Sequence, residues 1–426
     1  MAQSTIALLI LLVTVILFVT EKIPLSLTAM LSAITMGLFG IMSWSDVFSG
    51  MSNSIIIFLV GCGILGASYF STGLADKIGQ AIMRMGSALT EKRLILFLYI
   101  IGAITSAFFN GAMIVAVLFP IIDAMVHSSN GRLTRKQLYL PTAVSTVFGS
   151  NMTTIGSTSM MLAVSLLASS ENGYQFSFFE PIWIGLPGTL AAFLVYATFG
   201  CRMQDRIFNY PDIPSDVDVI ELKGESSSGL TKHQWITVIT TLACIGSIIF
   251  GLNYGAAGFI AASVLIVTGC IDLKHAYRSA GWEIIFLVAG SLGIAKGLQV
   301  SGAGQVIADV TLKVFSFTAN SPAGLCIVVL FLATLLSNFM SNGATVSIVV
   351  PIALSLALAL GTNPAPFALA GAIGANLSVA TPICVTQVTM SCSAGYNFRS
   401  LIRMGGFLNL VTFVVTAVAL LVVYYI

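Results

Sequence analysis

The sequence predicts an all-α membrane protein: an inverted repeat of about ten transmembrane helices, two re-entrant hairpins and two broken helices. Composition is the first of three observations behind this prediction. Of the 426 residues, 57% are hydrophobic and only 8% are charged, whereas a soluble domain carries about 25% charged residues. Such a chain cannot cover a water-facing surface, so we expect an integral protein of the plasma (inner) membrane.

The order of apolar and polar segments is the second observation. Two apolar stretches, 139–169 and 367–393, are interrupted by polar residues and predict broken helices. The shorter apolar pairs within 94–126 and 323–360 predict hairpins that enter and leave on one side, the alternative being two separate spans in each pair. Uninterrupted spans of sufficient length are expected at 4–20, 24–42, 54–70, 181–200, 233–251, 255–271, 283–300 and 405–425.

Basic residues indicate the orientation. With both hairpins formed, all 18 Lys and Arg residues except Lys296 and Lys313 fall on one side of the membrane. The positive-inside rule makes that side cytoplasmic and places both termini outside the cytoplasm. Replacing a hairpin by two spans returns the chain to the same side, so charge does not decide between them.

Similarity between the two halves is the third observation. The polar segment 201–232 predicts a cytoplasmic linker between a first half, 1–200, and a second half, 233–426. Phe58, Gly111 and Gly149 align with Phe286, Gly343 and Gly374 at offsets of about 228 residues, and an odd number of crossings between the copies inverts the second. The matching segments are 55–78 with 283–307, 105–121 with 336–352, and 149–157 with 374–382.

Polar, glycine-rich knots interrupt the apolar segments at 105–112, 149–159, 337–345 and 376–382. Irregular backbone at membrane depth survives only where protein or a water-filled cavity satisfies it. Freed carbonyls can coordinate a cation, and helix N-termini attract an anion. The knots therefore predict the midplane site of a secondary transporter, with close helix packing through small residues as the alternative.

Other classes of function are disfavoured by the charged and reactive residues. A net charge of +2 gives no reason to expect a nucleic-acid partner, and the seven scattered cysteines and three histidines form no metal cluster. No Ser/His/Asp or HExxH constellation suggests an enzyme. Because no acid lies deep in a span, Na⁺ coupling is favoured over a proton relay. Lys296 is interpreted as snorkelling toward the outer face.

Several segments resemble one family of carriers. TEKIPLSLTAML, GWEIIFLVAGSLGIAKGLQVSG and GGFLNLVTFVV are similar to the divalent anion/sodium symporters, the INDY-like dicarboxylate, citrate and sulfate carriers of the ion transporter superfamily. The resemblance covers nearly the whole chain and begins one span later than in many members. It implies an elevator mechanism, a homodimer, a bilayer environment and Na⁺ as the only cofactor.

Site residues follow from the Ser-Asn-Thr motif that the family carries at each hairpin tip. The second tip keeps Ser-Asn but has Gly in the third position, and the first tip, counted back from Pro120, reads Asn-Gly-Ala. The resemblance implies substrate contacts at Asn110, Gly111, Ala112, Ser341, Asn342, Gly343, Thr381 and Pro382. It implies Na⁺ ligands at Ser106, Asn110, Gly111 and Ser150 in the first half, and at Ser337, Asn342 and Ala380 in the second.

The expected function is secondary transport of a small organic di-anion, such as a C4-dicarboxylate, coupled to Na⁺. The altered first tip leaves the first Na⁺ site and the exact substrate open. Two alternatives use the same scaffold: a carrier of an inorganic oxyanion such as sulfate, or a Na⁺-independent anion exchanger. A membrane protein without transport activity is a further alternative.

Overall fold

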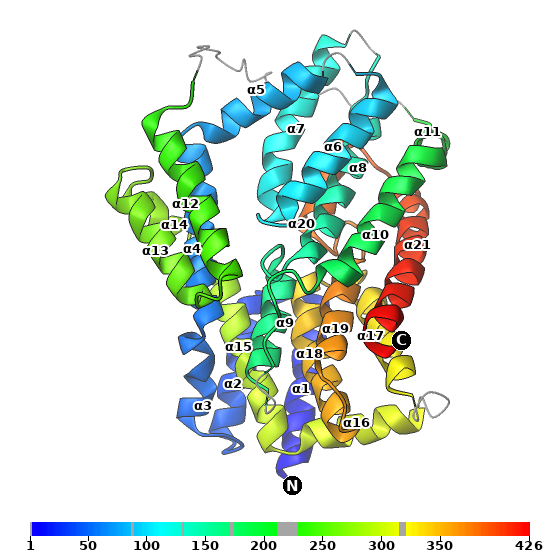
Figure 1. The fold of residues 1–426 in the computed structure, drawn as a ribbon. Helices are drawn as coiled ribbons and strands as arrows, with labels where there is room; N and C mark the ends of the chain where they lie inside the picture. The colour runs from blue at the N-terminus through cyan, green and yellow to red at the C-terminus, as the bar shows by residue number, and fades with distance from the viewer. Residues whose placement is uncertain (1, 87–88, 130–131, 171–173, 211–228, 315–320) are drawn as a thin grey trace.

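The computed structural model describes residues 2–426 except 87–88, 130–131, 171–173, 211–228 and 315–320. The described residues form helices and no strand (Figure 1), which confirms the predicted all-α class. Both termini lie in the lower half of Figure 1. Most of the expected linker, 211–228, falls outside the described residues.

The first half of the chain ends in a helix that runs further than predicted. After a π-helical turn, α11 continues seven residues into the expected linker, where the Gln204 side-chain amide donates to the carbonyls of Lys136 and Gln137 at 2.8 and 2.9 Å. The elements are α1 (Gln3–Thr20), α2 (Leu25–Leu38), α3 (Trp44–Phe48), η1 (Ser49–Ser52), α4 (Ser54–Ser71), α5 (Leu74–Gly86), α6 (Glu91–Ser106), α7 (Gly111–Ser128), α8 (Arg135–Gly149), η2 (Ser150–Met152), α9 (Thr158–Ala168), α10 (Ile182–Val195), η3 (Tyr196–Gly200) and α11 (Cys201–Ile207).

The second half repeats the same series of elements. Three helices are followed by a long helix, an amphipathic helix, a hairpin, a broken helix and a final long helix. These elements are α12 (Lys232–Ile249), α13 (Tyr254–Val267), α14 (Leu273–Arg278), α15 (Trp282–Val300), α16 (Ala303–Val314), α17 (Pro322–Ser337), α18 (Asn342–Ala359), α19 (Ala365–Asn376), α20 (Thr386–Ser391), η4 (Cys392–Ala394) and α21 (Phe398–Tyr425).

Seven stretches among the described residues are long and apolar enough to cross a membrane. Two of them, α7 and α18, are the return arms of the expected hairpins, while α2 and α13 are apolar but shorter. An integral membrane protein is thereby confirmed, and the number of crossings stays a prediction. The seven are Gln3–Thr20, Trp44–Ser71, Gly111–Ser128, Ile182–Ile207, Trp282–Val300, Asn342–Ala359 and Phe398–Tyr425.

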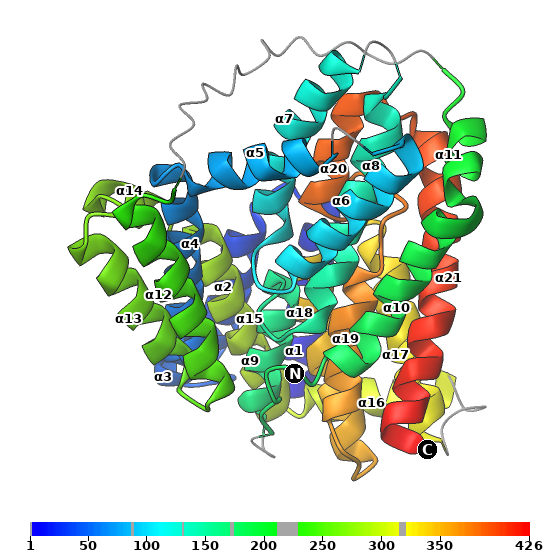
Figure 2. The same cartoon turned by 45° about the horizontal axis from the view of Figure 1, so that its top comes forward.

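The helices pack in two groups. In the first group α2 packs on α15 and α4 on α13; in the second, α6 packs on α8, α17 on α19, and α10 on α21. Figures 1 and 2 show the first group on the left and the second on the right. Backbones touch inside the first group, since a Cβ on Gly61 would lie 2.5 Å from the carbonyl oxygen of Gly258. Small residues allow such close packing where lipid supplies no hydrophobic drive between helices.

The amphipathic helices α5 and α16 connect the two groups. The helix α5 contacts α4 and α7, and α16 contacts α15 and α18. They lie at opposite ends of the molecule, α5 at the top of Figure 1 and α16 at the bottom. The α6–α7 hairpin occupies the upper half of the same view, and α17–α18 the lower half. Each hairpin therefore follows an amphipathic helix at its own end.

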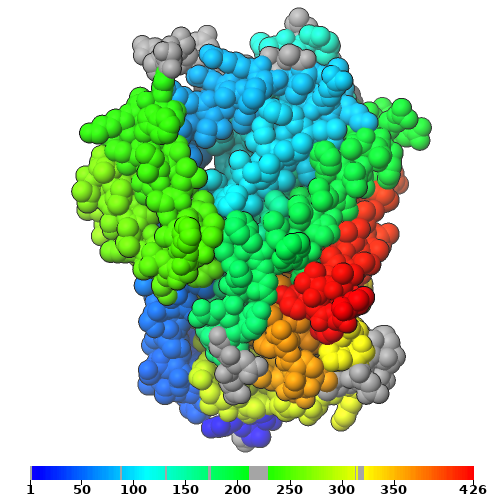
Figure 3. Space-filling model, in the orientation of Figure 1, coloured from blue at the N-terminus to red at the C-terminus, as the bar shows by residue number. Residues whose placement is uncertain are grey.

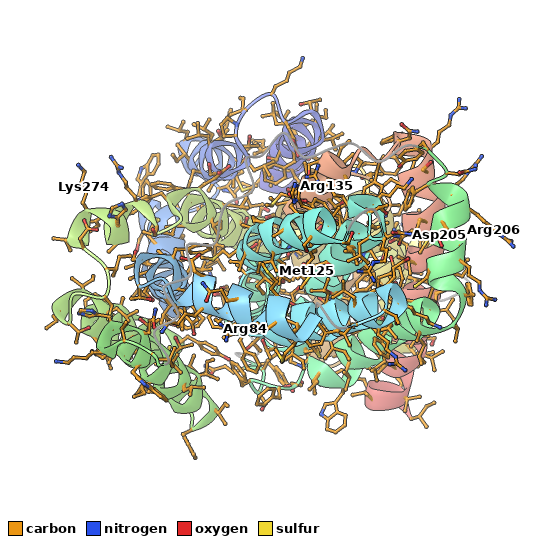
Figure 4. All side chains as sticks on the ribbon, turned by 90° about the horizontal axis from the view of Figure 1, so that it is seen from above. Arg84, Met125, Arg135, Asp205, Arg206 and Lys274 are labelled. Atoms are coloured by element: carbon orange, nitrogen blue, oxygen red, sulfur yellow. The ribbon has the colours of Figure 1, made fainter. Side chains whose placement is uncertain are left out.

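A part-buried ion pair fastens the upper end of the second group. The Arg135 Nε donates to Asp123 Oδ1 at 2.8 Å, and the Tyr139 hydroxyl donates to the same oxygen at 2.7 Å. Arg135 also reaches the Ser393 carbonyl at 3.4 Å, so α7 and α8 are joined to the segment that follows α20. Figure 4 shows Arg135 from above, together with Arg84, Arg206 and Lys274 from α5, α11 and α14.

Replacing Arg135 by Ala should destabilise the protein strongly. The change leaves the part-buried Asp123 carboxylate without its cation, and the upper bound is the cost of about 3–5 kcal/mol for removing one member of a fully buried pair. The melting temperature in detergent measures this effect. Arg132→Ala, which removes a more exposed arginine from the same end, is the matched control. Equal melting temperatures for the two variants would contradict the assigned role.

Candidate substrate and cation site

The predicted polar knots coincide with breaks between helices. Helices α6 and α7 are separated at 107–110, α17 and α18 at 338–341, and the broken helices at 153–157 and 377–385. Side-chain caps explain where the next helices begin: Asn110 accepts from the Ala112 N–H at 2.9 Å, and Ser341 accepts from the Ala344 N–H at 3.3 Å. Small polar residues at these points thus satisfy helix N-termini inside the molecule.

The Asn342 side chain is the centre of the second tip. One terminal atom of its amide lies 2.6 Å from Ser337 Oγ, 2.9 Å from the Cys384 carbonyl oxygen and 3.1 Å from the Ala375 carbonyl oxygen. The hydroxyl of Ser378 lies 2.9 Å from Ser337 Oγ. Because α17, α18, α19 and the second break all contribute an atom, the tip is assembled from segments that are separate in sequence.

The two orientations of this amide have different chemical meaning. With its nitrogen toward the two carbonyls, Asn342 donates to both, and its oxygen then faces Asn376 Oδ1 at 2.9 Å. With its oxygen there, Asn342 joins Ser337, Ala375 and Cys384 in a ring of neutral oxygens, which suits a hard cation. The residues present therefore fit a Na⁺ ion, and rotation of one amide interconverts the two arrangements.

A pair of asparagines links the second tip to the first broken helix. The Asn376 amide donates to Asn151 Oδ1 at 2.8 Å and to Ser157 Oγ at 2.9 Å, and its oxygen accepts from Ser159 Oγ at 2.9 Å. Asn376 also contacts the Asn342 amide at 2.9 Å. The side chains of Asn151 and Asn376 are each 1% exposed. They occupy equivalent positions in the two similar segments of the sequence, so the two halves meet through matching residues.

Asn338 and Asn409 hold the second break in place. Thr381 Oγ1 donates to the Asn338 carbonyl at 2.6 Å, and the Ala380 N–H donates to Asn338 Oδ1 at 3.3 Å. From α21, Asn409 donates to Asn338 Oδ1 at 3.1 Å and accepts from the Val379 N–H at 2.9 Å. Asn338 therefore connects Thr381 and Ala380 to the second hairpin tip. The neighbouring Pro382 carbonyl accepts from the Thr389 hydroxyl.

The first tip is built differently. Ser106 and Ser150 are buried, and each hydroxyl donates to a carbonyl of its own helix segment. Asn110 is exposed and caps α7 with its side chain. A Cβ on Gly111 would lie 2.4 Å from Gln387 Nε2, so α20 covers this position closely. Ala112 offers no polar side chain. Among the described residues, no hydrogen bond joins the two tips directly.

A cavity of about 540 Å³ lies between the two groups of helices. Asn110, Gly156 and Ser157 line it on the side of the first tip, and Thr241, His275 and Ser279 line it on the side of α12 and α14. His275 is exposed, so the cavity extends toward the surface. Figure 3 shows the molecule hollowed between the green surface of α12 and the blue and cyan surface of α5 and α6.

Sequence reasoning missed several residues that the structure places at the site. Asn151 and Asn376 belong to predicted knots, and their equivalent positions in the repeat could have marked them. Asn409 is a lone amide in the 28-residue helix α21, and an isolated polar side chain in an apolar helix is itself a signal. Asn338 and Ser378 also belong to predicted knots, but no local pattern indicates their partners, which lie in other segments.

The fold and the site together define a membrane transporter. The model of the CitMHS family, described as citrate transporter, matches residues 15–374. The chain belongs to this family, and it is a secondary transporter of organic anions rather than an enzyme. The resemblance to the divalent anion/sodium symporters is confirmed.

Individual relatives are distant. The sodium-dependent dicarboxylate transporter SdcS of Staphylococcus aureus is 22% identical over 443 residues, covering 96% of this chain and 83% of that protein. An uncharacterized transporter of Synechocystis sp. is 28% identical over 194 residues, 46% of this chain and 31% of its own length. The YdaH transporter of Alcanivorax borkumensis shares the fold, with a TM-score of 0.58 at 14% identity over 92% of this chain and 88% of that one.

Replacing Asn376 by Ala should lower both stability and transport. The change removes the partner of Asn151, Ser159 and Asn342 at once, and each buried polar group left unpaired costs about 1–3 kcal/mol. Melting temperature and substrate uptake measure the two effects. Asn397→Ala, at an exposed position whose side chain makes no cap hydrogen bond, is the control. Wild-type uptake by the Asn376 variant would contradict the role given to this network.

Proposed function

We propose that the protein couples the movement of Na⁺ to that of a small organic di-anion of the C4-dicarboxylate class. The observation that carries the proposal is the cluster of neutral oxygens around Asn342. The family supports an organic anion as substrate, and the name of the Staphylococcus aureus relative supports both Na⁺ and a dicarboxylate.

The cation is expected at the second tip. Ser337 Oγ, Asn342 Oδ1 and the carbonyl oxygens of Ala375 and Cys384 are the proposed ligands. Among the described residues no Asp, Glu or Lys is buried, and the one buried charged residue, Arg135, is paired with Asp123. A buried carboxylate that could relay a proton is therefore absent from that part of the chain. Coupling through neutral oxygens suits Na⁺.

The anion is expected between the two tips. Helices α7 and α18 begin there, and their first N–H groups and positive dipole ends favour a carboxylate. A bound Na⁺ would offset part of the remaining negative charge of the di-anion. The proposed contacts are Asn110, Gly111 and Ala112 at the first tip, Ser341, Asn342 and Gly343 at the second, and Thr381 with Pro382 in the second break.

Transport is proposed to follow an elevator mechanism. The group that contains both hairpins and both broken helices would slide against the group built on α2, α4, α13 and α15, within a homodimer. The repeated series of elements, with α5 and α16 at opposite ends, supports an inverted repeat. We place the basic end in the cytoplasm and both termini outside, as the charge distribution predicts.

A second candidate function is favoured by the first tip. Its side chains supply no buried amide equivalent to Asn342, so only one cation site of this kind is evident among the described residues. An anion exchanger that does not need Na⁺, or a carrier of an inorganic oxyanion such as sulfate, would fit a reduced cation site. Counterflow of labelled succinate and sulfate, each with Na⁺ or K⁺, separates these candidates.

Na⁺ should raise the melting temperature of the purified protein in the presence of succinate, whereas equal K⁺ should not. Ligands that bind only the folded state stabilise it by mass action. Asn342→Ala should abolish the Na⁺-dependent shift and reduce labelled succinate uptake into proteoliposomes at least about tenfold, the effect of losing about 1.4 kcal/mol of binding.

Asn397→Ala again serves as the control, because it removes an amide at an exposed position. Succinate uptake that is indifferent to a Na⁺ gradient would overturn the coupling. Failure to take up or exchange any dicarboxylate would overturn the substrate class.

A further inference from the structure

A second cavity, of about 360 Å³, lies toward the opposite end of the molecule from the first. One wall comes from α15 and from the segment around α3 and η1, and the other from the C-terminal parts of α9 and α18. Like the first cavity, it therefore lies between the two groups of helices. Its polar lining residues are Asp46, Ser49, Asn53, Ser169, Ser170, Lys296, Gln299 and Ser355.

Lys296 is the unusual member of this lining. It lies in α15, a helix apolar enough to cross the membrane, where an ammonium group is costly. Leu292, Ala295 and Gln299 line the cavity from the same face of the helix, so the lysine faces an internal space shared with polar groups. The expected snorkelling toward the outer face stays a prediction.

The charge of Lys296 is not neutralised by a carboxylate among the described residues, where the ion pairs are Arg135–Asp123 and His275–Asp272. Asp46 lines the same cavity, and its carboxylate accepts from Ser43 Oγ at 2.6 Å. Because the described residues form no Lys296–Asp46 ion pair, the ammonium group is left to meet a carboxylate that enters the cavity.

The cationic feature is confined to one half of the repeat. The alignment of the two long helices places Ser68 of α4 opposite Lys296, and the Ser68 hydroxyl donates to the Leu65 carbonyl at 2.6 Å. The first cavity has no Lys or Arg in its lining. A cationic side chain therefore lines one of these two cavities and not the other, although the helices around them are similar.

We propose that the second cavity is an extracytoplasmic vestibule, in which Lys296 captures a dicarboxylate before it reaches the second hairpin tip. Gln299 and Ser355 line the same cavity as the ammonium group, and the Ser355 hydroxyl donates to the Pro351 carbonyl at 3.0 Å. Pro351 and Ser355 belong to α18, whose first residues form that tip, so one wall of the cavity leads to the proposed substrate site. The inference rests on the proposed transport of dicarboxylates. It adds one residue, Lys296, that sets the affinity for the dicarboxylate on the extracytoplasmic side.

The test is initial uptake of labelled succinate by intact cells that express the full chain and lack dicarboxylate carriers of their own. Lys296→Gln should raise the KM about tenfold, because it removes electrostatic attraction in the vestibule, and leave the maximal rate within about a factor of two. Lys296→Arg should restore a KM close to that of the wild type. Added choline chloride should narrow the difference in KM between Lys296→Gln and the wild type, since salt screens the charge of Lys296.

Lys313→Gln is the matched control, because it removes an exposed lysine from α16 at the same end of the molecule but outside the cavity. Its KM should stay at the wild-type value. A Lys296→Gln KM equal to that of the wild type would overturn the vestibule, as would an equal rise in the control. Absence of saturable uptake by the wild type would instead overturn the proposed substrate class.

Discussion

The structure depends on satisfying polar groups inside the membrane without charged side chains. Each break in a helix frees backbone N–H and C=O groups, and none can be left unpaired in a medium without water. Some serine and threonine hydroxyls bond within their own segments, while others, such as those of Ser159 and Thr381, reach across segments, as the asparagine amides do. Asn376 and Asn151 join the two broken helices, and Asn338 and Asn409 join the second hairpin to α21. These neutral bonds hold irregular backbone together at the centre of the protein.

Neutral amides can also respond to an ion without a change of protonation. One end of the Asn342 amide lies 3.1 and 2.9 Å from the carbonyl oxygens of Ala375 and Cys384. An amide nitrogen at this end donates to both carbonyls, whereas an amide oxygen there completes a ring of neutral oxygens that suits a hard cation. The other end contacts Asn376, which bonds to the first broken helix. The proposed cation ligands are therefore one hydrogen bond away from the network that joins the two halves.

Sequence patterns predicted the fold well because the membrane limits the choice of structure. Apolar runs marked the long helices, and polar knots marked every break, because small polar residues are tolerated at such depth only where the helix ends. The sequence could not predict which residues contact one another across segments. Nothing local indicates that Asn409 bonds Asn338, or that Gln387 covers Gly111. The end of α10 was also misjudged, because the charged sequence of α11 resembles a loop until Gln204 docks on α8.

The two halves of the chain differ in the polar and charged residues that they place at the tips and cavities. Both halves supply a hairpin, a broken helix and a bridging amphipathic helix. Among the described residues, however, the buried Ser337–Asn342 pair has no counterpart at the first tip, and Lys296 has none in α4. A perfectly symmetrical transporter would meet its substrate identically from both sides. Placing the proposed cation site and Lys296 in one half would let the affinity for substrate differ between the two faces of the membrane.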